Sequence, residues 1–270
     1  MSSNKRTIEI NREYLTRVEG HGNIVVNVRE GRVETCELRV VEAPRLFEGM
    51  LRGRSVFEAP HITSRICGIC ACGHTLASIK AAEEALGIVP SVQTLRLREL
   101  LLLLEILDSH LLHIYFLAAP DFLNAAGFIP LIDTQPKAMR RALRLKKACN
   151  HACEVLAGRH VHPISAVIGG FTKLPGEKDI ETLYRLLTGM RPDIEATAEF
   201  VAALEFPSFQ RDTEYVALSN NGDDYPLLEG DVVSTDGARL GPHEYRRITN
   251  EFVVPYSTAK HARLSRESYA

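Results

Sequence analysis

The stretch TSRICGICACGHTLASIKAAEEALG, residues 63–87, decides the fold. Its first half places three cysteines and a histidine within eight positions: Cys67, Cys70, Cys72 and His74. Its second half has apolar residues at helical spacing, and Gly87 follows as a stop signal. A Cys-x-x-Cys pair that closes a turn brings two thiolates within reach of one metal ion, and a following helix N-terminus lowers the pKa of a thiol. The stretch therefore predicts a soft-metal site at the start of a helix.

Two other interpretations of this cysteine cluster remain open on spacing alone. A structural zinc site requires four ligands, and the other close-set pair, Cys149 and Cys153, lies far away in the sequence within a predicted helix. A redox-active Cys-x-x-Cys without a metal is the other alternative. His74 follows Cys70 by four residues, so on a helix it shares that face and could hydrogen-bond a ligating sulfur without binding the metal.

Composition indicates an ordinary globular protein whose function depends on a local site. The 270 residues are 45% hydrophobic and the formal net charge is −2, so no bulk field attracts nucleic acid or an anionic membrane. Six cysteines in a chain of this length, with no signal peptide at the N-terminus, predict a reduced, cytoplasmic location. The most apolar run, residues 99–120, contains Glu105 and Asp108, which favours a buried helix over a transmembrane segment.

The hydrophobic pattern predicts an α+β, mainly α fold, with a central bundle of long helices and a small N-terminal antiparallel β-element. Residues 7–42 alternate as strands, with Glu30-Gly31 as the hairpin turn. Helices are expected over residues 75–87, 91–118, 136–156 and 178–204, and Pro192 threatens to break the last one. We expect a single incomplete domain over residues 1–270, with a β-rich part (1–60), a helical part (61–205) and a mixed segment (206–270).

Four ordered motifs resemble the large subunit of nickel-iron hydrogenases. The string from Arg65 to His74 resembles that family's R-x-C-G-x-C-x-x-x-H motif. The other three elements are Arg17-Val18-Glu19-Gly20-His21, the stretch Pro44-Arg45-Leu46-Phe47-Glu48 with Gly53-Arg54, and Gly158-Arg159-His160-Val161-His162-Pro163 with Gly169-Gly170. The second of these departs from the family's R-G-F-E pattern, because Leu46 replaces the usual glycine. The resemblance implies that this chain takes part in cleaving dihydrogen.

The resemblance also implies a role for each matching residue. Cys67 would be a terminal thiolate on nickel, and Cys70 would bridge nickel to an iron that carries carbonyl and cyanide ligands. His74 would donate a hydrogen bond to the bridging sulfur. Glu19 would accept the proton released when dihydrogen is split, and Glu48 would bind magnesium or a similar hard cation. His162 would lie toward the electron-transfer partner.

Each remaining candidate has a simpler interpretation. Without the resemblance, Glu19 would be a solvated turn carboxylate, and His160 a satisfied loop histidine. His110 and His113, three residues apart on the apolar run, are expected to be core or polar-network histidines. The remaining cysteines are interpreted as buried apolar residues, namely Cys36, Cys149 and Cys153, while Cys72 is left undecided.

The sequence holds only half of the family's active site. That site takes two further cysteines from a C-terminal D-P-C-x-x-C-x-x-H motif, whereas the last cysteine here is Cys153. The missing ligands would come from a second chain or from a further segment. We therefore expect a C-terminal large-subunit fragment as a partner if the large subunit is split, together with further electron-acceptor subunits and an iron-sulfur small subunit. The alternative is a catalytically inactive structural or scaffold subunit of a redox complex, since the quinone-site subunit of respiratory complex I resembles this family without its metal. A zinc-knuckle interaction module is a second, more remote alternative.

Overall fold

The computed structural model describes residues 8–12, 15, 18–220, 222, 225–244, 247, 251–263 and 268–269. The chain divides into two compact units. The sheet unit consists of residues 1–46 and 210–270, and the helical unit consists of residues 47–209. The cysteine motif lies entirely within the helical unit. The expected parts of one domain, 1–60, 61–205 and 206–270, stay a prediction.

The sheet unit is built on an antiparallel sheet with the order β1-β2-β3. Its strands are β1 (Ile8–Arg12), β2 (Gly22–Arg29) and β3 (Arg32–Val40). The predicted hairpin turn is confirmed, because Glu30 and Gly31 both have positive φ, 52° and 81°, which matches the twist of the paired strands. Thr258 donates a hydrogen bond to the Val40 carbonyl at 2.8 Å, which ties the C-terminal part of this unit to β3.

The C-terminal part of the sheet unit has short strands. A second antiparallel sheet has the order β6-β7-β8, from β6 (Val216–Ser219), β7 (Asp231–Ser234) and β8 (Arg239–Leu240). A 3-10 turn, η2 (Pro242–Glu244), follows, and β9 (Ala262–Arg263) pairs with β10 (Ser268–Tyr269).

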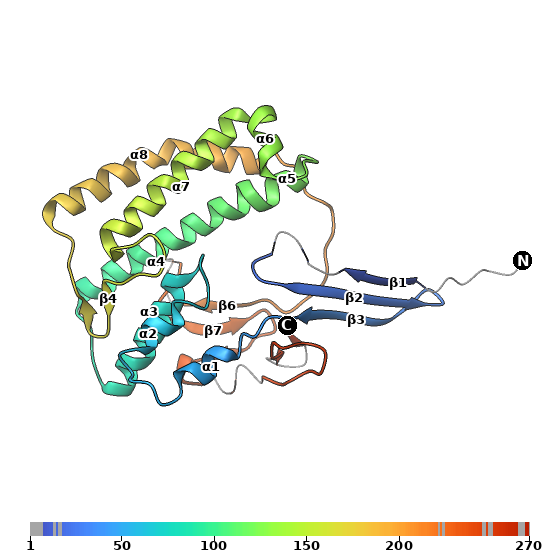
Figure 1. Ribbon diagram of the computed structural model, residues 1–270, viewed down its shortest axis with the longest axis horizontal. Coiled ribbons are helices and arrows are strands. Elements are labelled where there is room, and N and C mark those ends of the chain that lie inside the picture. The colour runs from blue at the N-terminus through green and yellow to red at the C-terminus, as the bar shows by residue number, and fades with distance from the viewer. Residues whose placement is uncertain are drawn as a thin grey trace, which may run out of the picture. The chain divides into compact units, whose positions relative to one another are not determined.

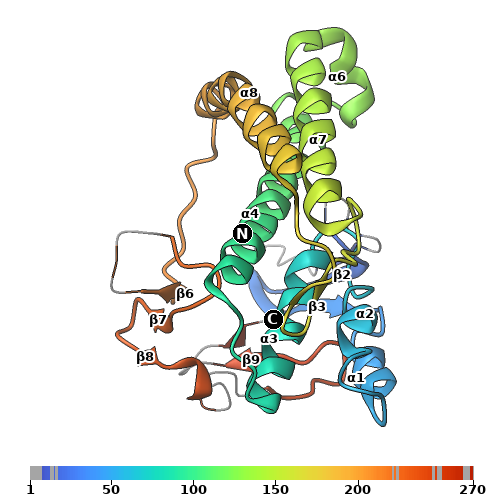
Figure 2. The same cartoon turned by 90° about the vertical axis from the view of Figure 1, so that its left-hand side faces the viewer.

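The helical unit is a bundle of long helices, as the apolar spacing predicts (Figures 1 and 2). Its main helices are α3 (Ala71–Leu86), α4 (Val92–Leu112), α7 (Pro136–Ala157) and α8 (Glu177–Ala202). Figure 1 shows α4, α7 and α8 running side by side, with α3 against α4. Shorter elements are α1 (Leu46–Leu51), α2 (Ala59–Thr63), the π-helix η1 (His113–Ala118), α5 (Ala119–Phe122), α6 (Phe128–Thr134), β4 (Ala166–Val167) and β5 (Gly170–Phe171). The predicted α+β, mainly α architecture is confirmed.

Local signals set several helix ends. The side chain of Ser91 caps α4 by accepting a hydrogen bond from the Thr94 amide at 3.2 Å. Gly87 ends α3 with φ 66°, as a C-terminal glycine commonly does. Helix α3 begins at Ala71, four residues before the expected start, because Cys70 already occupies the N-cap position. The cysteine motif therefore leads directly into the helix.

Two buried clusters hold the bundle together. The first lies where α3, α4 and α7 meet and is centred on Ile79, Leu101 and Leu156, which are almost fully buried. The second includes Tyr115 and Cys149 and joins η1, α6, α7 and α8. The stretch Val92–Phe122 is long and apolar enough to cross a membrane, a test that core helices also pass. Its buried Arg98 and Glu105 fit a core helix, as expected from the sequence.

Three local predictions are wrong. Helix α8 continues through Pro192 without a break. Proline removes one backbone hydrogen bond of the helix, but Leu183, Met190 and Thr197 are buried on both sides of the exposed Pro192, so their packing keeps the helix intact. Cys36 is exposed, since it lies on an outward-facing position of β3. His110 and His113 are also exposed, so they are neither core nor buried network residues.

Candidate metal centre

The Cys67–Cys70 loop connects α2 to α3 and brings two sulfur atoms together. The structure pairs Cys67 and Cys70 as a disulfide, with their Cα atoms 5.5 Å apart. The backbone amides of Ile69 and Cys70 donate hydrogen bonds to Cys67 Sγ at 3.4 Å and 3.1 Å. Cys67 is half-buried and Cys70 is exposed. In the reduced form, these donors stabilise negative charge on the Cys67 sulfur, which a metal-binding thiolate requires.

A distant loop supports the segment before the cysteines. His162 Nδ1 lies 2.7 Å from the Ser64 carbonyl oxygen, so the loop after α7 contacts the residue that precedes Arg65. His162 has a φ of 56°, in the left-handed region that a histidine rarely adopts, and the backbone strain indicates that the surrounding loop imposes this position. The sequence element that contains His162 therefore lies near the cysteine motif, although its place relative to a partner stays a prediction.

His74 lies on α3, one turn after Cys70, as its spacing predicts. Its amide donates to the Cys70 carbonyl at 3.3 Å, so the helix has formed by this residue. Its ring lines an apolar groove with Leu51, Val56 and Ile66. Burial in this groove lowers the pKa of His74, which favours a neutral ring. The expected hydrogen bond to a bridging sulfur stays a prediction.

The two candidate carboxylates lie in different units. Glu48 is exposed on α1 of the helical unit, and Glu19 is exposed in a bend of the sheet unit. Arg17, the first residue of the motif that contains Glu19, lies outside the described residues. His21 of the same motif is ion-paired, with Nδ1 2.6 Å from Glu42 Oε1. The proton-acceptor role of Glu19 and the cation-binding role of Glu48 stay predictions.

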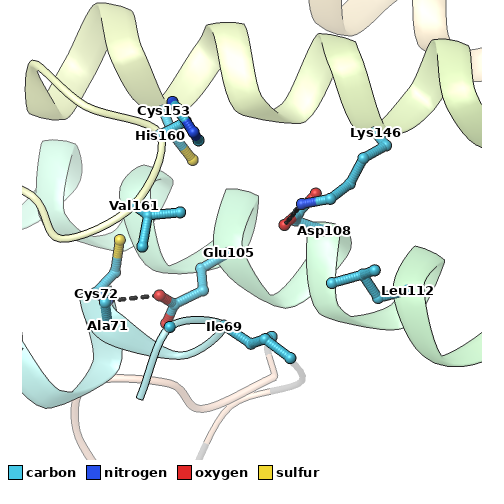
Figure 3. Close-up of a pocket in the computed structure, with 11 residues that line it drawn as sticks. Ile69, Ala71, Cys72, Glu105, Asp108, Leu112, Lys146, Cys153, His160 and Val161 are labelled. Atoms are coloured by element: carbon cyan, nitrogen blue, oxygen red, sulfur yellow. Dashed lines mark hydrogen bonds and ion pairs between the residues drawn. The ribbon is translucent and has the colours of Figure 1, made fainter. Parts of the chain in front are cut away.

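Sequence reasoning missed the carboxyl that lies directly behind the motif. Glu105, on α4, is 9% exposed and accepts a hydrogen bond from the backbone amide of Cys72 at 2.5 Å (Figure 3). It accepts a second one from the backbone amide of Gly73 at 2.8 Å. Its carboxylate thus caps the N-terminus of α3 from a neighbouring helix. Burial raises the pKa of Glu105 against the opposing effect of these hydrogen bonds. A lone glutamate in a leucine run was the only signal in the sequence.

The remaining buried cysteines are thiols that resist ionisation. Burial raises the pKa of Cys149 and of Cys153 to about 12, with nearby Asp108 adding to both shifts. Burial also raises the pKa of Cys72, and Glu105 adds to that shift. Cys149 and Cys153 are buried as expected, and Cys72, which was undecided, joins them. None of the three has the environment of a reactive thiolate.

The donor set of the described residues fits only part of a metal centre. Cys67 and Cys70 supply two soft sulfur donors on one loop. Across the part of the chain that the structure describes, no group of three or more His, Cys, Asp and Glu side chains is placed to hold one metal ion. A closed site of four ligands, such as structural zinc, is therefore not formed by these residues. The pair fits one half of a shared thiolate site.

Comparison with known proteins points to one family. Residues 45–140 match the family model described as nickel-dependent hydrogenase, and residues 8–43 match a second model described as HoxL-like. The chain is 32% identical to the alpha subunit of sulfhydrogenase 1 from Pyrococcus furiosus, over 93% of its length and 59% of that protein. It is 31% identical to a subunit of the vhu F420-non-reducing hydrogenase of Methanocaldococcus jannaschii, over 95% of this chain and 66% of that one.

Solved structures agree with the sequence matches. The chain superimposes on an NAD+-reducing [NiFe]-hydrogenase with a TM-score of 0.84 and 29% identity, over 94% of this chain and 61% of that one. It shares the fold of the Ni-Fe-Se hydrogenase of D. vulgaris Hildenborough, with a TM-score of 0.71 and 23% identity over 96% of this chain and 64% of that one. The chain spans about three fifths to two thirds of the length of these relatives.

Proposed function

The chain belongs to the nickel-dependent hydrogenase family, and from this premise we propose that it forms part of the catalytic large subunit of a nickel-iron hydrogenase. The reaction would be the reversible heterolytic cleavage of dihydrogen into protons and electrons. One observation supports the proposal most directly. The sulfurs of Cys67 and Cys70 lie together at the start of α3, inside the segment that the family model matches.

The two cysteines would hold a nickel-iron centre with carbonyl and cyanide ligands on iron, which supplies the site where dihydrogen is split. Both thiols must be deprotonated to bind metal, and the two amides on Cys67 Sγ favour that form. Glu19 would accept the released proton, and His74 would hydrogen-bond the shared sulfur. Glu48 would hold magnesium or a similar hard cation through its carboxylate oxygens.

Partners are part of the proposal. Two thiolates do not complete a soft-metal site, so a second chain or a further segment would supply the remaining ligands. Electrons would leave through an iron-sulfur small subunit to further acceptor subunits, within the cytoplasm. The relatives are named as individual subunits of hydrogenases, which supports a multi-subunit enzyme. Their names range from sulfhydrogenase to F420-non-reducing and NAD+-reducing hydrogenase, so the terminal acceptor is not assigned.

Metal analysis and infrared spectroscopy test this function. We expect the chain alone to lose nickel to a chelator, whereas its complex with a chain that carries the second cysteine pair keeps nickel and shows bands from iron-bound carbonyl and cyanide. Cys67→Ser and Cys70→Ser should abolish both signals. Cys36→Ser is the matched control, because that thiol is exposed on β3, and it should keep both.

Two results would overturn the proposal. Stoichiometric nickel retained by the chain alone after chelation would show that its own residues complete the site. A purified complex that contains only zinc, or no metal and no carbonyl and cyanide bands, would instead support the interaction module or the inactive scaffold subunit.

A further inference from the structure

A small cavity lies directly behind the loop that joins Cys67 to Cys70. Its volume is about 50 Å³, and Gly68 and Ile69 of that loop form part of its wall. Figure 3 shows Ile69 and the other labelled residues around it. Helices α3, α4 and α7 form the rest, together with the loop after α7 that carries His160. A water molecule needs roughly 10–15 Å³ of such space. The cavity, named here the Glu105 cavity, can therefore hold several water molecules.

The polar groups that line the Glu105 cavity are suited to hydrogen-bond water molecules. Glu105 contributes its buried carboxyl from α4, and Asp108 contributes a second carboxyl one turn later on the same helix. Asp108 Oδ2 pairs with Lys146 Nζ at 2.5 Å, but its Oδ1 is buried and has no hydrogen-bond partner among the described residues. A buried unpaired oxygen beside a polar cavity is ordinarily satisfied by an ordered water.

The far end of the cavity is nearer to solvent. The Lys146 side chain is 27% exposed, and its ammonium also contacts Asn150 Oδ1 at 3.2 Å. His160 lines the cavity and is exposed, with Nδ1 2.9 Å from Glu154 Oε1. Both side chains therefore reach bulk water. The cavity thus joins the inner side of the cysteine loop to the protein surface.

We propose that the Glu105 cavity is a water-filled proton route from the cysteine loop to the surface. The carboxyls of Glu105 and Asp108 are its successive proton acceptors, and Lys146 marks its exit. The inference rests on the proposed function, since splitting dihydrogen at the cysteine pair releases one proton that must leave. The Glu105 cavity gives that proton an exit besides Glu19: the proton is passed to water, then to each carboxylate in turn, and finally to solvent. Each carboxyl returns to its starting charge, so no oxidant or reductant is consumed.

The surroundings of Glu105 suit a group that takes up and returns a proton. Burial raises its pKa, so the carboxyl holds a proton more readily than an exposed one. The titratable groups that face it come from every wall of the cavity: Cys72 on α3, Asp108 on α4, Cys153 and Lys146 on α7, and His160 on the following loop. Transfer between carboxyls through water needs no movement of the backbone, because the acceptors lie one helical turn apart.

The first test uses the chain alone and does not depend on activity. Infrared difference spectra recorded between about pH 4 and pH 8 should show a protonated carboxyl that titrates above the ordinary glutamate range. This band should shift when D₂O replaces water and should be missing in Glu105→Gln. Glu99→Gln is the matched control on the same helix, since Glu99 pairs with Arg96 near the surface, and it should keep the band. The absence of any such titrating band, or a band that shifts only after prolonged incubation in D₂O, would show that solvent protons do not reach Glu105 and would overturn the route.

The second test uses the assembled, nickel-containing enzyme. Isotope exchange between deuterium gas and water should slow by about tenfold or more in Glu105→Gln and in Asp108→Asn, a range typical of lost proton-transfer groups. Nickel content and the carbonyl and cyanide bands should stay unchanged. Asp108 pairs with Lys146 on α7 instead of capping α3, so slower exchange in Asp108→Asn is not explained by a weakened helix N-terminus. Glu99→Gln should exchange at the wild-type rate.

The outcomes separate this inference from the function on which it rests. Wild-type exchange rates in both variants, with full nickel, would overturn the proton route and leave the hydrogenase function standing. An assembled wild-type complex without nickel would overturn the proposed function and the route with it.

Discussion

Removing either partner of the buried ion pair between Glu83 and Arg98 should strongly destabilise the folded protein. Arg98 donates to Glu83 through both terminal nitrogens, at 2.8 Å and 2.6 Å, and the two side chains are only 5% and 2% exposed. Glu83 also accepts from the Gly169 amide at 2.7 Å, and Arg98 donates to the Val167 carbonyl at 3.0 Å. The pair therefore fastens α3 and α4 to the β4–β5 turn.

The expected magnitudes follow from the charges that each substitution leaves behind. Glu83→Leu leaves a buried guanidinium without its counter-ion, and Arg98→Met leaves a buried carboxylate, each at a cost of about 3–5 kcal/mol. The double variant removes both charges, leaving mainly the Gly169 amide and the Val167 carbonyl to find partners. We expect it to cost less than either single variant, because replacing a buried pair by apolar groups is often close to neutral.

Urea unfolding measures this cycle. Far-UV circular dichroism is the suitable signal, because the chain has no tryptophan and the helical unit holds the long helices. With a slope of about 2 kcal/mol per M, each single variant should lower the midpoint by about 1.5–2.5 M. Glu195→Ala, which removes one partner of the exposed Arg191 pair, serves as a control and should change stability by less than about 0.5 kcal/mol. Additive losses in the double variant would refute the reasoning.

Two further predictions follow from the buried ionisable groups. In the reduced chain, iodoacetamide should label the exposed Cys36 and Cys70 much faster than Cys149 and Cys153, whose pKa values are raised to about 12 by burial. Mass spectrometry of the labelled native protein measures the rates, and rapid labelling of Cys149 would contradict its burial. Because the pKa of Glu105 is raised above 4.5 by burial, its contribution should favour the folded state at low pH and be lost as pH rises through the folded pKa. The free energy lost in Glu105→Gln should therefore be smaller at about pH 8 than at about pH 4, and an equal loss at both would contradict it.

Structural features that depend on only a few neighbouring residues could be predicted from the sequence. The positive φ at Glu30 and Gly31, the Ser91 cap and the Gly87 stop each depend on local backbone geometry, so residue type predicts them well. The long helices were also predictable, because their apolar stripes repeat over several turns. The cysteine motif belongs to this class, since Cys67 and Cys70 need only one turn to bring their sulfurs together.

Features that depend on packing between distant segments could not be predicted from the sequence. Pro192 predicts a break, but the burial of Met190 and Thr197 on either side holds α8 together. Cys36 has the chemistry of a buried residue, yet its side of β3 faces solvent. Glu105 lies 33 positions from Cys72 in the sequence, and only the contact of α4 with α3 brings its carboxyl to the cysteine motif.

That contact changes how the cysteines reach the thiolate form. The sequence predicts that the positive end of α3 lowers the pKa of the motif's thiols. In the structure, the first-turn amides of Cys72 and Gly73 are bonded to the Glu105 carboxyl instead. When Glu105 is ionised, its negative charge offsets part of the helix dipole that would otherwise act on the sulfurs. The direct support for a thiolate comes from the loop itself, where the amides of Ile69 and Cys70 donate hydrogen bonds to Cys67 Sγ, while Cys70 is exposed to solvent.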